Sequence, residues 1–396
     1  MTASEHARQP PTFMLVCGEP SGDQLGAELM AGLEQICPGA RIVGVGGPAM
    51  TARGLTSLFP LDATAVMGLR EVVPRIPEIL RRVRVASDFA LATRPDAVVC
   101  IDSPDFTHRI AQRIRRLDPT IPTMNYVAPQ VWASRQYRAK KMARYFDLVL
   151  ALLPFEAAFF EKHGLHAAFA GHPVIERAAK MTGGATLRAR LHIPLNAPAL
   201  AILPGSRMSE VRPLLPIFRN AVTRLRRSVP DLVCLLPAVP HLEATVRDLT
   251  TDWPAPLHIV HSEADKFASF SAADVALAAS GTVTTELALA GVPMVVTYKL
   301  GWMTYALMRP FIRVPYVALP NLLLGREAIP ELLQARCRAD LLAEQLEQLF
   351  LNADVREKQK KYLAEAAAIL GVGGEPPSLR AARALLDFVK QRRAAR

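Results

Sequence analysis

The stretch Ala276-Leu-Ala-Ala-Ser-Gly-Thr-Val-Thr-Thr-Glu-Leu-Ala-Leu-Ala-Gly-Val-Pro-Met-Val-Val-Thr297 predicts a strand, a tight turn, a helix and a second strand. The apolar run Val275 to Ala279 has the length of a strand, and residues 284–290 have helical spacing before Gly291. A turn formed by Ser280, Gly281 and Thr282 leaves the free N–H groups of the helix start facing outward, with the positive end of the helix dipole. Such a turn predicts an anion-binding site, suited to phosphate.

Glu286 lies about one turn into this helix, where its carboxylate can accept hydrogen bonds from a sugar diol. The alternative interpretation is an ordinary strand–helix unit. In that case Ser280 or Thr282 only caps the helix, and Glu286 faces solvent.

A second turn, Pro204-Gly-Ser-Arg207, follows a predicted strand at residues 199–203 and repeats the same pattern. Gly205 allows a ligand to approach the backbone closely, and Ser206 offers a hydroxyl group and an N–H group. Arg207 offers a planar guanidinium for phosphate, although a surface salt bridge is the alternative role. Two such turns in one domain predict a diphosphate site.

Strands alternate with helices in both halves of the chain, which predicts an α/β protein with two doubly wound parallel-sheet domains facing each other across a cleft. The first domain is predicted over residues 12–180 and the second over residues 199–370, with a Gly- and Pro-containing boundary between them. The tail from Ala339 to Arg396 is predicted to be helical with one interruption, at residues 371–377. Its last helix, within residues 376–396, can pack back on the first domain.

The composition restricts the function classes. The 396 residues are 51% apolar, which excludes a disordered or fibrous chain, and the net charge of +11 favours anionic partners. No nucleic-acid partner is expected, because no helix-turn-helix, RNA-recognition or Arg-rich tract is present.

Five cysteines without a CxxC spacing predict neither disulfides nor a zinc site. The polar start of the chain predicts no secretory signal, and no apolar run has the ~18 to 20 residues of a membrane span.

Two stretches combine apolar and basic residues. They cover residues 66–84 and residues 298–324. Each predicts either a surface that lies on anionic lipid or a helix that packs on its own sheet.

In the first domain the candidate general base is Asp102, which follows the predicted strand at residues 97–101. Ligands of parallel sheets bind at the carboxyl ends of strands, and Asp105 and Glu19 are less well placed there. Capping of the helix that begins near Pro104 is the alternative role for Asp102. The chain has no Walker A motif, D-x-D pair or His/Cys cluster, so no metal and no cofactor is expected.

Nine motifs in this chain resemble those of the lipid-A-disaccharide synthase family and occur in the family's order. They are Gly18-Glu-Pro-Ser-Gly-Asp23, Met67-Gly-Leu-Arg-Glu-Val-Val73, Ile101-Asp-Ser-Pro-Asp-Phe106, Tyr126-Val-Ala-Pro-Gln-Val-Trp-Ala133, Leu153-Pro-Phe-Glu156, Gly171-His-Pro173, Leu203-Pro-Gly-Ser-Arg207, Ala279-Ser-Gly-Thr282 and Leu319-Pro-Asn321. The resemblance covers about residues 12 to 340 and implies a GT-B glycosyltransferase with two Rossmann-like domains.

The implied reaction joins UDP-2,3-diacylglucosamine to 2,3-diacylglucosamine 1-phosphate by an inverting displacement. The products are a β-1,6-linked lipid A disaccharide 1-phosphate and UDP. The family acts without a metal as a peripheral protein at the cytoplasmic, anionic face of the inner membrane. A homodimer is compatible with the sequence.

The resemblance also implies roles for individual residues. Asp102 corresponds to the family's proposed base. The implied substrate-binding residues are Glu19, Ser21, Gly22, Asp23, Met67, Pro129, Gln130 and Trp132. The implied UDP-binding residues are Gly205, Ser206, Arg207, Ser280, Gly281, Thr282, Glu286 and Asn321.

Two other functions remain open at this point. A UDP-sugar epimerase would share the UDP site but act on a water-soluble sugar. A membrane-surface binding protein would retain the nucleotide cleft without using Asp102 for catalysis.

Overall fold

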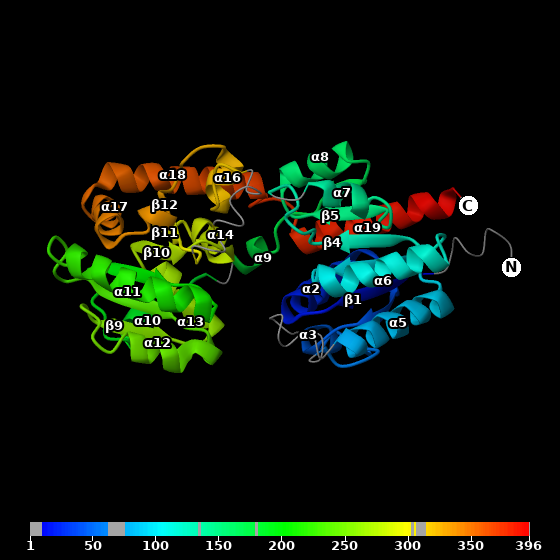
Figure 1. Ribbon diagram of the computed structural model, residues 1–396, viewed down its shortest axis with the longest axis horizontal. Coiled ribbons are helices and arrows are strands. Elements are labelled where there is room, and N and C mark those ends of the chain that lie inside the picture. The colour runs from blue at the N-terminus through cyan, green and yellow to red at the C-terminus, as the bar shows by residue number, and fades with distance from the viewer. Residues whose placement is uncertain are drawn as a thin grey trace. The chain divides into compact units, whose positions relative to one another are not determined.

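The computed structural model describes residues 10–61, 76–133, 136–178, 181–301, 305 and 314–395. The chain divides into two compact units (Figure 1). The first unit contains Met1–Pro173 together with Gly374–Arg396, and the second contains Val174–Gly373.

The first unit is built on a six-stranded sheet of order β2-β1-β3-β4-β5-β6, and each neighbouring pair of strands is parallel. The strands are β1 (Thr12–Cys17), β2 (Arg41–Val45), β3 (Ala97–Ile101), β4 (Thr123–Tyr126), β5 (Leu148–Ala151) and β6 (Ala167–Phe169). The helices are α2 (Pro20–Ile36), α3 (Pro48–Thr51), α5 (Ile76–Thr93), α6 (Pro104–Leu117), α7 (Tyr137–Met142), α8 (Pro154–Lys162) and α19 (Pro377–Ala394).

The second unit repeats this architecture with the sheet order β12-β11-β10-β7-β8-β9, again with parallel pairs. Its strands are β7 (Ala199–Leu203), β8 (Val233–Pro237), β9 (Leu257–Val260), β10 (Val275–Ala279), β11 (Met294–Tyr298) and β12 (Glu331–Leu333). Its helices are α9 (Val174–Ala178), α10 (Gly184–Arg190), α11 (Met208–Leu225), η3 (Pro240–Leu242), α12 (Glu243–Leu249), α13 (Glu263–Ala272), α14 (Thr282–Leu289), α16 (Leu319–Leu324), η5 (Gln334–Arg336), α17 (Ala339–Leu351) and α18 (Ala353–Leu370). The prediction of two doubly wound parallel-sheet domains is confirmed.

Central strands in both sheets are buried along their whole length. All five residues of β3, of β7 and of β10 are buried, which explains why these strands are continuous apolar runs in the sequence. In each sheet the chain reverses its winding direction once, between β1 and β3 and between β7 and β10. A crevice at the carboxyl ends of the strands is expected at such a reversal.

The tail differs in one respect from the sequence prediction. The predicted interruption at residues 371–377 is present, but a second break separates α17 from α18. Asn352 causes it, because its side-chain oxygen accepts hydrogen bonds from the N–H groups of Asp354 and Val355 and so caps a new helix.

The last helix, α19, packs against α2 within the first unit. Its residues Ala381, Leu385 and Val389 are buried in the core of that unit. The guanidinium group of Arg393 forms two hydrogen bonds, of 2.7 and 2.8 Å, with the carboxylate of Asp96 just before β3. The chain therefore returns to the first unit after completing the second.

All five cysteines are free thiols. Within the described ranges, none of the helices combines the length and the apolar character needed to cross a membrane.

Candidate functional site

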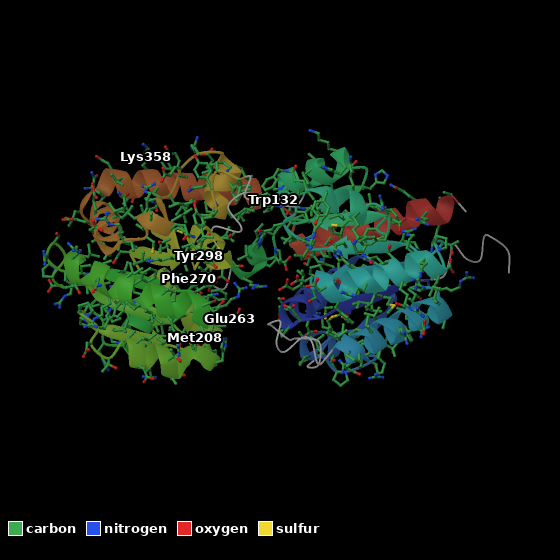
Figure 2. All side chains as sticks on the ribbon, viewed as in Figure 1. Trp132, Met208, Glu263, Phe270, Tyr298 and Lys358 are labelled. Carbon is green, nitrogen blue, oxygen red and sulfur yellow. The ribbon has the colours of Figure 1, made fainter. Side chains whose placement is uncertain are left out.

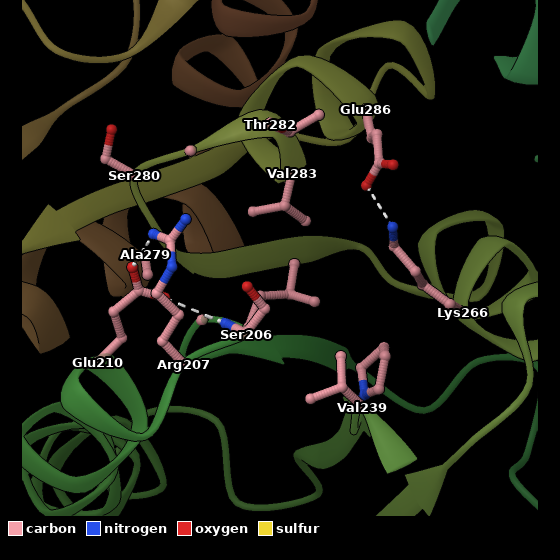
Figure 3. Close-up of a pocket in the computed structure, with 14 residues that line it drawn as sticks. Ser206, Arg207, Glu210, Val239, Lys266, Ala279, Ser280, Thr282, Val283 and Glu286 are labelled. Carbon is pink, nitrogen blue, oxygen red and sulfur yellow. Dashed lines mark hydrogen bonds and ion pairs between the residues drawn. The ribbon is translucent and has the colours of Figure 1, made fainter. Parts of the chain in front are cut away.

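A cavity of about 320 Å³ lies in the second unit at the carboxyl ends of β7 and β10, where the strand order reverses (Figure 3). The turns that follow these strands form much of its wall. The lining residues are Leu203, Gly205, Ser206, Arg207, Glu210, Pro237, Val239, Lys266, Ala279, Ser280, Gly281, Thr282, Val283 and Glu286. Of the eight residues implied to bind UDP, only Asn321 is missing from this wall.

The turn before α11 is held by a carboxylate that the sequence analysis did not identify. Glu210 accepts hydrogen bonds from the backbone N–H of Ser206 at 3.1 Å, from the Arg207 guanidinium at 3.1 Å and from the Tyr298 hydroxyl at 3.2 Å. Gly205 has a φ of +112°, and a Cβ atom there would lie 2.4 Å from Glu210 Oε2. Because Glu210 fixes the turn, Arg207 stays at the cavity with 60% of its side chain exposed.

The turn before α14 leaves the helix start open. Gly281 is the N-cap residue and no side chain caps the helix, whereas the Ser280 hydroxyl donates to the carbonyl of Val317 at 3.4 Å. The alternative in which Ser280 or Thr282 only caps this helix is therefore wrong. Arg207, the N-cap of α11, likewise makes no side-chain cap. Two helix starts thus present backbone N–H groups at one cavity.

Glu286 and Lys266 both line the cavity, and their side chains point toward each other (Figure 3). Glu286 is only 3% exposed, so the alternative in which it faces solvent is wrong. Its Oε2 atom lies 2.6 Å from Lys266 Nζ, which also lies 5.2 Å from the centre of the Phe267 ring. The sequence prediction did not include Lys266, because this residue lies within a regular helix, α13, and belongs to none of the motifs.

Asn321 lies away from the cavity and its amide is fully engaged with the protein. Its side-chain oxygen accepts from the N–H groups of Ala328 and Ile329, at 2.7 and 2.9 Å. Its side-chain nitrogen donates to the Ile329 carbonyl and to the Glu331 carboxylate. These contacts fix the loop between α16 and β12, and the residue's implied role in UDP binding stays a prediction.

In the first unit Asp102 lies directly after β3, next to the point where the sheet reverses. The Ser21 hydroxyl donates to Asp102 Oδ2 at 3.0 Å, so α2 and β3 meet at this carboxylate. The N-cap of α6 is Ser103 and no side chain caps that helix, so the capping role considered for Asp102 is wrong.

Asp102 and Ser103 have φ values of 52° and 44°, a left-handed conformation that costs a non-glycine residue about 1–3 kcal/mol. Strained residues of this kind concentrate at functional sites.

Glu19 and Asp105 belong to the same acidic group. Burial raises the pKa of the Glu19 carboxyl, and the negative charges of Asp102 and Asp105 raise it further. The structure therefore brings Glu19, Ser21 and Asp102 together at the carboxyl ends of β1 and β3.

Two residues of the Gly18 to Asp23 loop have structural contacts instead. The buried carboxylate of Asp23 accepts hydrogen bonds from the N–H groups of Gly47, Ala49 and Met50, at 2.7 to 3.0 Å, and so holds the start of α3. A Cβ atom on Gly22 would lie 2.9 Å from Cys17 Cβ, so only glycine lets α2 approach β1 this closely. Both residues position the loop, and their implied contacts with substrate stay predictions.

The remaining implied substrate-binding residues are dispersed. Trp132, labelled in Figure 2, is 9% exposed, packs edge-to-face on Phe155 and donates from Nε1 to Glu156 Oε1 at 2.8 Å. Pro129 lines a separate cavity of the first unit, and Gln130 is exposed. Met67 lies outside the described residues, as do residues 66–75 of the first apolar and basic stretch and residues 302–304 and 306–313 of the second.

Within the part of the chain that the structure describes, no group of three or more His, Cys, Asp or Glu side chains has an arrangement that could hold a metal ion.

Replacement of Asp23 by Ala should destabilise the protein, because it leaves three backbone N–H groups near the protein interior without an acceptor. Unmet buried donors cost about 1–3 kcal/mol each. Thermal unfolding should show a clear loss, whereas Glu34→Ala, on the same helix with 79% of its side chain exposed, should unfold like the unaltered protein. An Asp23→Ala variant with unchanged stability but weakened substrate binding would contradict the structural role.

The family model described as lipid-A-disaccharide synthetase matches residues 13–372. The lipid-A-disaccharide synthase of Rhodospirillum centenum is 46% identical over 385 residues, covering 97% of this chain and 96% of that protein. The synthase of Gluconobacter oxydans is 42% identical over 389 residues, covering 98% and 93%.

Two solved structures are similar at low identity and show the fold alone. A putative UDP-N-acetylglucosamine 2-epimerase from Listeria monocytogenes has a TM-score of 0.66 and 15% identity, covering 98% of both chains. MurG of Acinetobacter baumannii has a TM-score of 0.57 and 16% identity, covering 96% of this chain and 99% of that one. The predicted GT-B fold class is confirmed, and the chain belongs to the lipid-A-disaccharide synthase family of glycosyltransferases.

Proposed function

We propose that this glycosyltransferase joins UDP-2,3-diacylglucosamine to 2,3-diacylglucosamine 1-phosphate in lipid A biosynthesis, and that it needs no metal or cofactor. The observation that carries the proposal is the cavity at β7 and β10. Two uncapped helix starts and the cations Arg207 and Lys266 surround this cavity. Backbone N–H groups and cations of this kind bind the diphosphate group of a nucleotide such as UDP.

The donor binds in the second unit under this proposal. Backbone N–H groups of the two turns and the Arg207 guanidinium neutralise the diphosphate, which becomes the leaving group. The Glu286 carboxylate accepts a hydrogen bond from a ribose hydroxyl while Lys266 compensates its charge. Without Lys266, a buried carboxylate beside an anionic ligand would be strongly unfavourable.

Proton removal belongs to the first unit. Asp102 accepts the proton of the acceptor's 6-hydroxyl group as that oxygen bonds to the anomeric carbon of the donor. The bond from the anomeric carbon to the diphosphate oxygen breaks on the opposite face, and its electron pair leaves with UDP. The configuration inverts, which gives the β-1,6 linkage. Ser21 holds the Asp102 carboxylate in place through its 3.0 Å hydrogen bond.

A peripheral location on the cytoplasmic, anionic face of the inner membrane fits substrates with acyl chains. The net charge of +11 supports it, since each Lys or Arg near such a surface contributes about 1 kcal/mol. Helix α5 adds apolar side chains, because Ile76 and Leu80 are 44% and 41% exposed beside Arg81 and Arg84.

UDP release in mixed micelles tests the reaction. Release from UDP-2,3-diacylglucosamine should require 2,3-diacylglucosamine 1-phosphate and should continue in EDTA. Release without the acceptor would indicate hydrolysis, and loss of release in EDTA would contradict the metal-free mechanism. Turnover of UDP-N-acetylglucosamine without detergent would favour an epimerase instead.

The Arg207→Ala variant should bind UDP at least ~10-fold more weakly, because a charge-assisted hydrogen bond to phosphate contributes about 1.5–3 kcal/mol. Calorimetric titration with UDP measures this. Arg212→Ala is the matched control, since Arg212 lies on the same helix, is exposed and does not line the cavity. Equal UDP affinities in the two variants would count against the diphosphate site.

Replacement of Asp102 by Asn should lower kcat by a factor of about 10² to 10⁴, the usual contribution of a general base. The loss should appear in kcat, while UDP affinity should stay unchanged, because the cavity proposed for UDP lies in the second unit. Asp88→Asn, at a carboxylate that is 59% exposed and paired with Arg113, serves as the control. A kcat in Asp102→Asn equal to that of Asp88→Asn would exclude Asp102 as the base.

A further inference from the structure

A second cavity, of about 470 Å³, lies in the first unit between α6 and the segment that begins with α7. The side chains that define it are His108 and Arg109 on α6, and Arg138, Lys141 and Tyr145 on and after α7. None of them belongs to the implied substrate-binding set. Pro129 is the one residue of that set in its wall.

The sequence spacing explains why these side chains converge. Asp105, His108, Arg109 and Gln112 follow one another at intervals that place them on one face of α6. Residues 138, 141, 142 and 145 have the same spacing on the second segment. Two faces that each carry polar and basic groups therefore meet at one cavity.

The charge of the cavity is mainly positive. Arg109, Arg138 and Lys141 line it, against the single carboxylate of Asp105. Within the described residues, neither Arg138 nor Lys141 forms an ion pair with a carboxylate. Arg109 donates from Nε to the main-chain carbonyl of Asp105 at 2.9 Å, which leaves the rest of its guanidinium for another acceptor. Cations gathered in this way, with little compensation from the protein, attract a multiply charged anion.

A buried polar pair adjoins these cations. His108 is only 8% exposed, and its Nδ1 atom lies 3.1 Å from the hydroxyl oxygen of Tyr145, which is 7% exposed. Burial lowers the pKa of His108 to about 4, helped by the charges of Arg138 and Lys141, so its imidazole is neutral near pH 7. Its buried Nε2 atom has no hydrogen-bond partner in the described structure. Buried polar atoms are rarely left unpaired, so this atom of a cavity-lining residue is a second unusual feature beside the cluster of cations.

The cavity begins at Pro104 and Asp105, immediately after the strained pair Asp102 and Ser103. In a hexopyranose 1-phosphate, the phosphate is on C1 and the 6-hydroxyl extends from C5, so the two groups flank the ring oxygen on different carbons. An enzyme that removes the proton of the 6-hydroxyl thus needs its phosphate site near the base but displaced from it. The wall of this cavity begins with Pro104, two residues along the chain from Asp102, which puts the cavity beside the candidate base.

We propose that Arg109, Arg138 and Lys141 bind the phosphate monoester of the acceptor sugar in this cavity. This assignment rests on the proposed function, which supplies an acceptor with a 1-phosphate group. The phosphate of an anionic phospholipid has related chemistry. The concave wall and the buried His108–Tyr145 pair favour a discrete sugar phosphate over a membrane surface.

The test is direct binding of glucosamine 1-phosphate, a soluble probe, to the full chain by calorimetric titration. The double variant Arg138→Ala/Lys141→Ala should bind it at least ~10-fold more weakly, as expected for the loss of charge-assisted hydrogen bonds. Lys140→Ala is the matched control, because Lys140 lies on the same helix and is exposed but does not line the cavity. Unchanged thermal unfolding and UDP affinity in the double variant exclude a folding defect as the cause.

Transfer assays add a second readout. The double variant should lose at least ~10-fold in kcat/KM with the 1-phosphate acceptor and little with 2,3-diacylglucosamine, which lacks the phosphate. Equal losses with both acceptors, or undiminished binding of glucosamine 1-phosphate, would overturn the proposal. A double variant that loses binding to phosphatidylglycerol vesicles but keeps its affinity for glucosamine 1-phosphate would also overturn the proposal. If transfer is absent in the unaltered enzyme, the proposed function fails, whereas the binding measurement still reports on the cavity.

Discussion

The reversal of winding in each parallel sheet is the constraint on which both candidate sites depend. Where successive crossovers leave in opposite directions, no helix covers the carboxyl ends of the two adjacent strands, and the following turns line an open crevice. In the second unit these strands are β7 and β10, so turns separated by more than seventy residues meet at one cavity. In the first unit they are β1 and β3, so Ser21 reaches Asp102. The location of the chemistry therefore follows from strand order before any side chain is considered.

Charge compensation then determines which groups of the cavity remain able to bind an anion. Glu210 holds Arg207 but is shared with a backbone N–H group and the Tyr298 hydroxyl, so the exposed guanidinium keeps donors for a ligand. Lys266 and Glu286 form a tighter pair, in which the carboxylate is almost fully buried. Removing one partner of such a pair would leave an uncompensated buried charge, which is why the two are best regarded as one polar unit of the wall.

Local sequence patterns were sufficient for the strands, for the two turns and for the position of Asp102 at the end of β3, because each of these depends on a few consecutive residues. They were insufficient where a contact joins distant elements. Glu210 and Lys266 lie on regular helices, and only the fold brings them to the cavity. Membership in a motif also did not reveal the direction of a side chain. Asp23 and Asn321 lie in motifs that resemble the family's, yet both side chains bind backbone groups of their own unit. Asn352 shows the same limit at the level of elements, since an asparagine within a helical pattern became a cap.

The strain at Asp102 and Ser103 is best understood together with these structural contacts. Two consecutive left-handed residues without glycine persist only where the surroundings determine the backbone. Gly22 lets α2 approach the ends of β1 and β3, and Asp23 anchors the same helix start to α3. The Thr107 hydroxyl, on α6, donates to the main-chain carbonyl of Asp102 at 2.6 Å and so fixes the Asp102 backbone from the side of that helix. Contacts within the protein, made by Gly22, Asp23 and Thr107, therefore hold the Asp102 carboxylate at the crevice. The loop that resembles the family's motif therefore has a structural role in the geometry of Asp102.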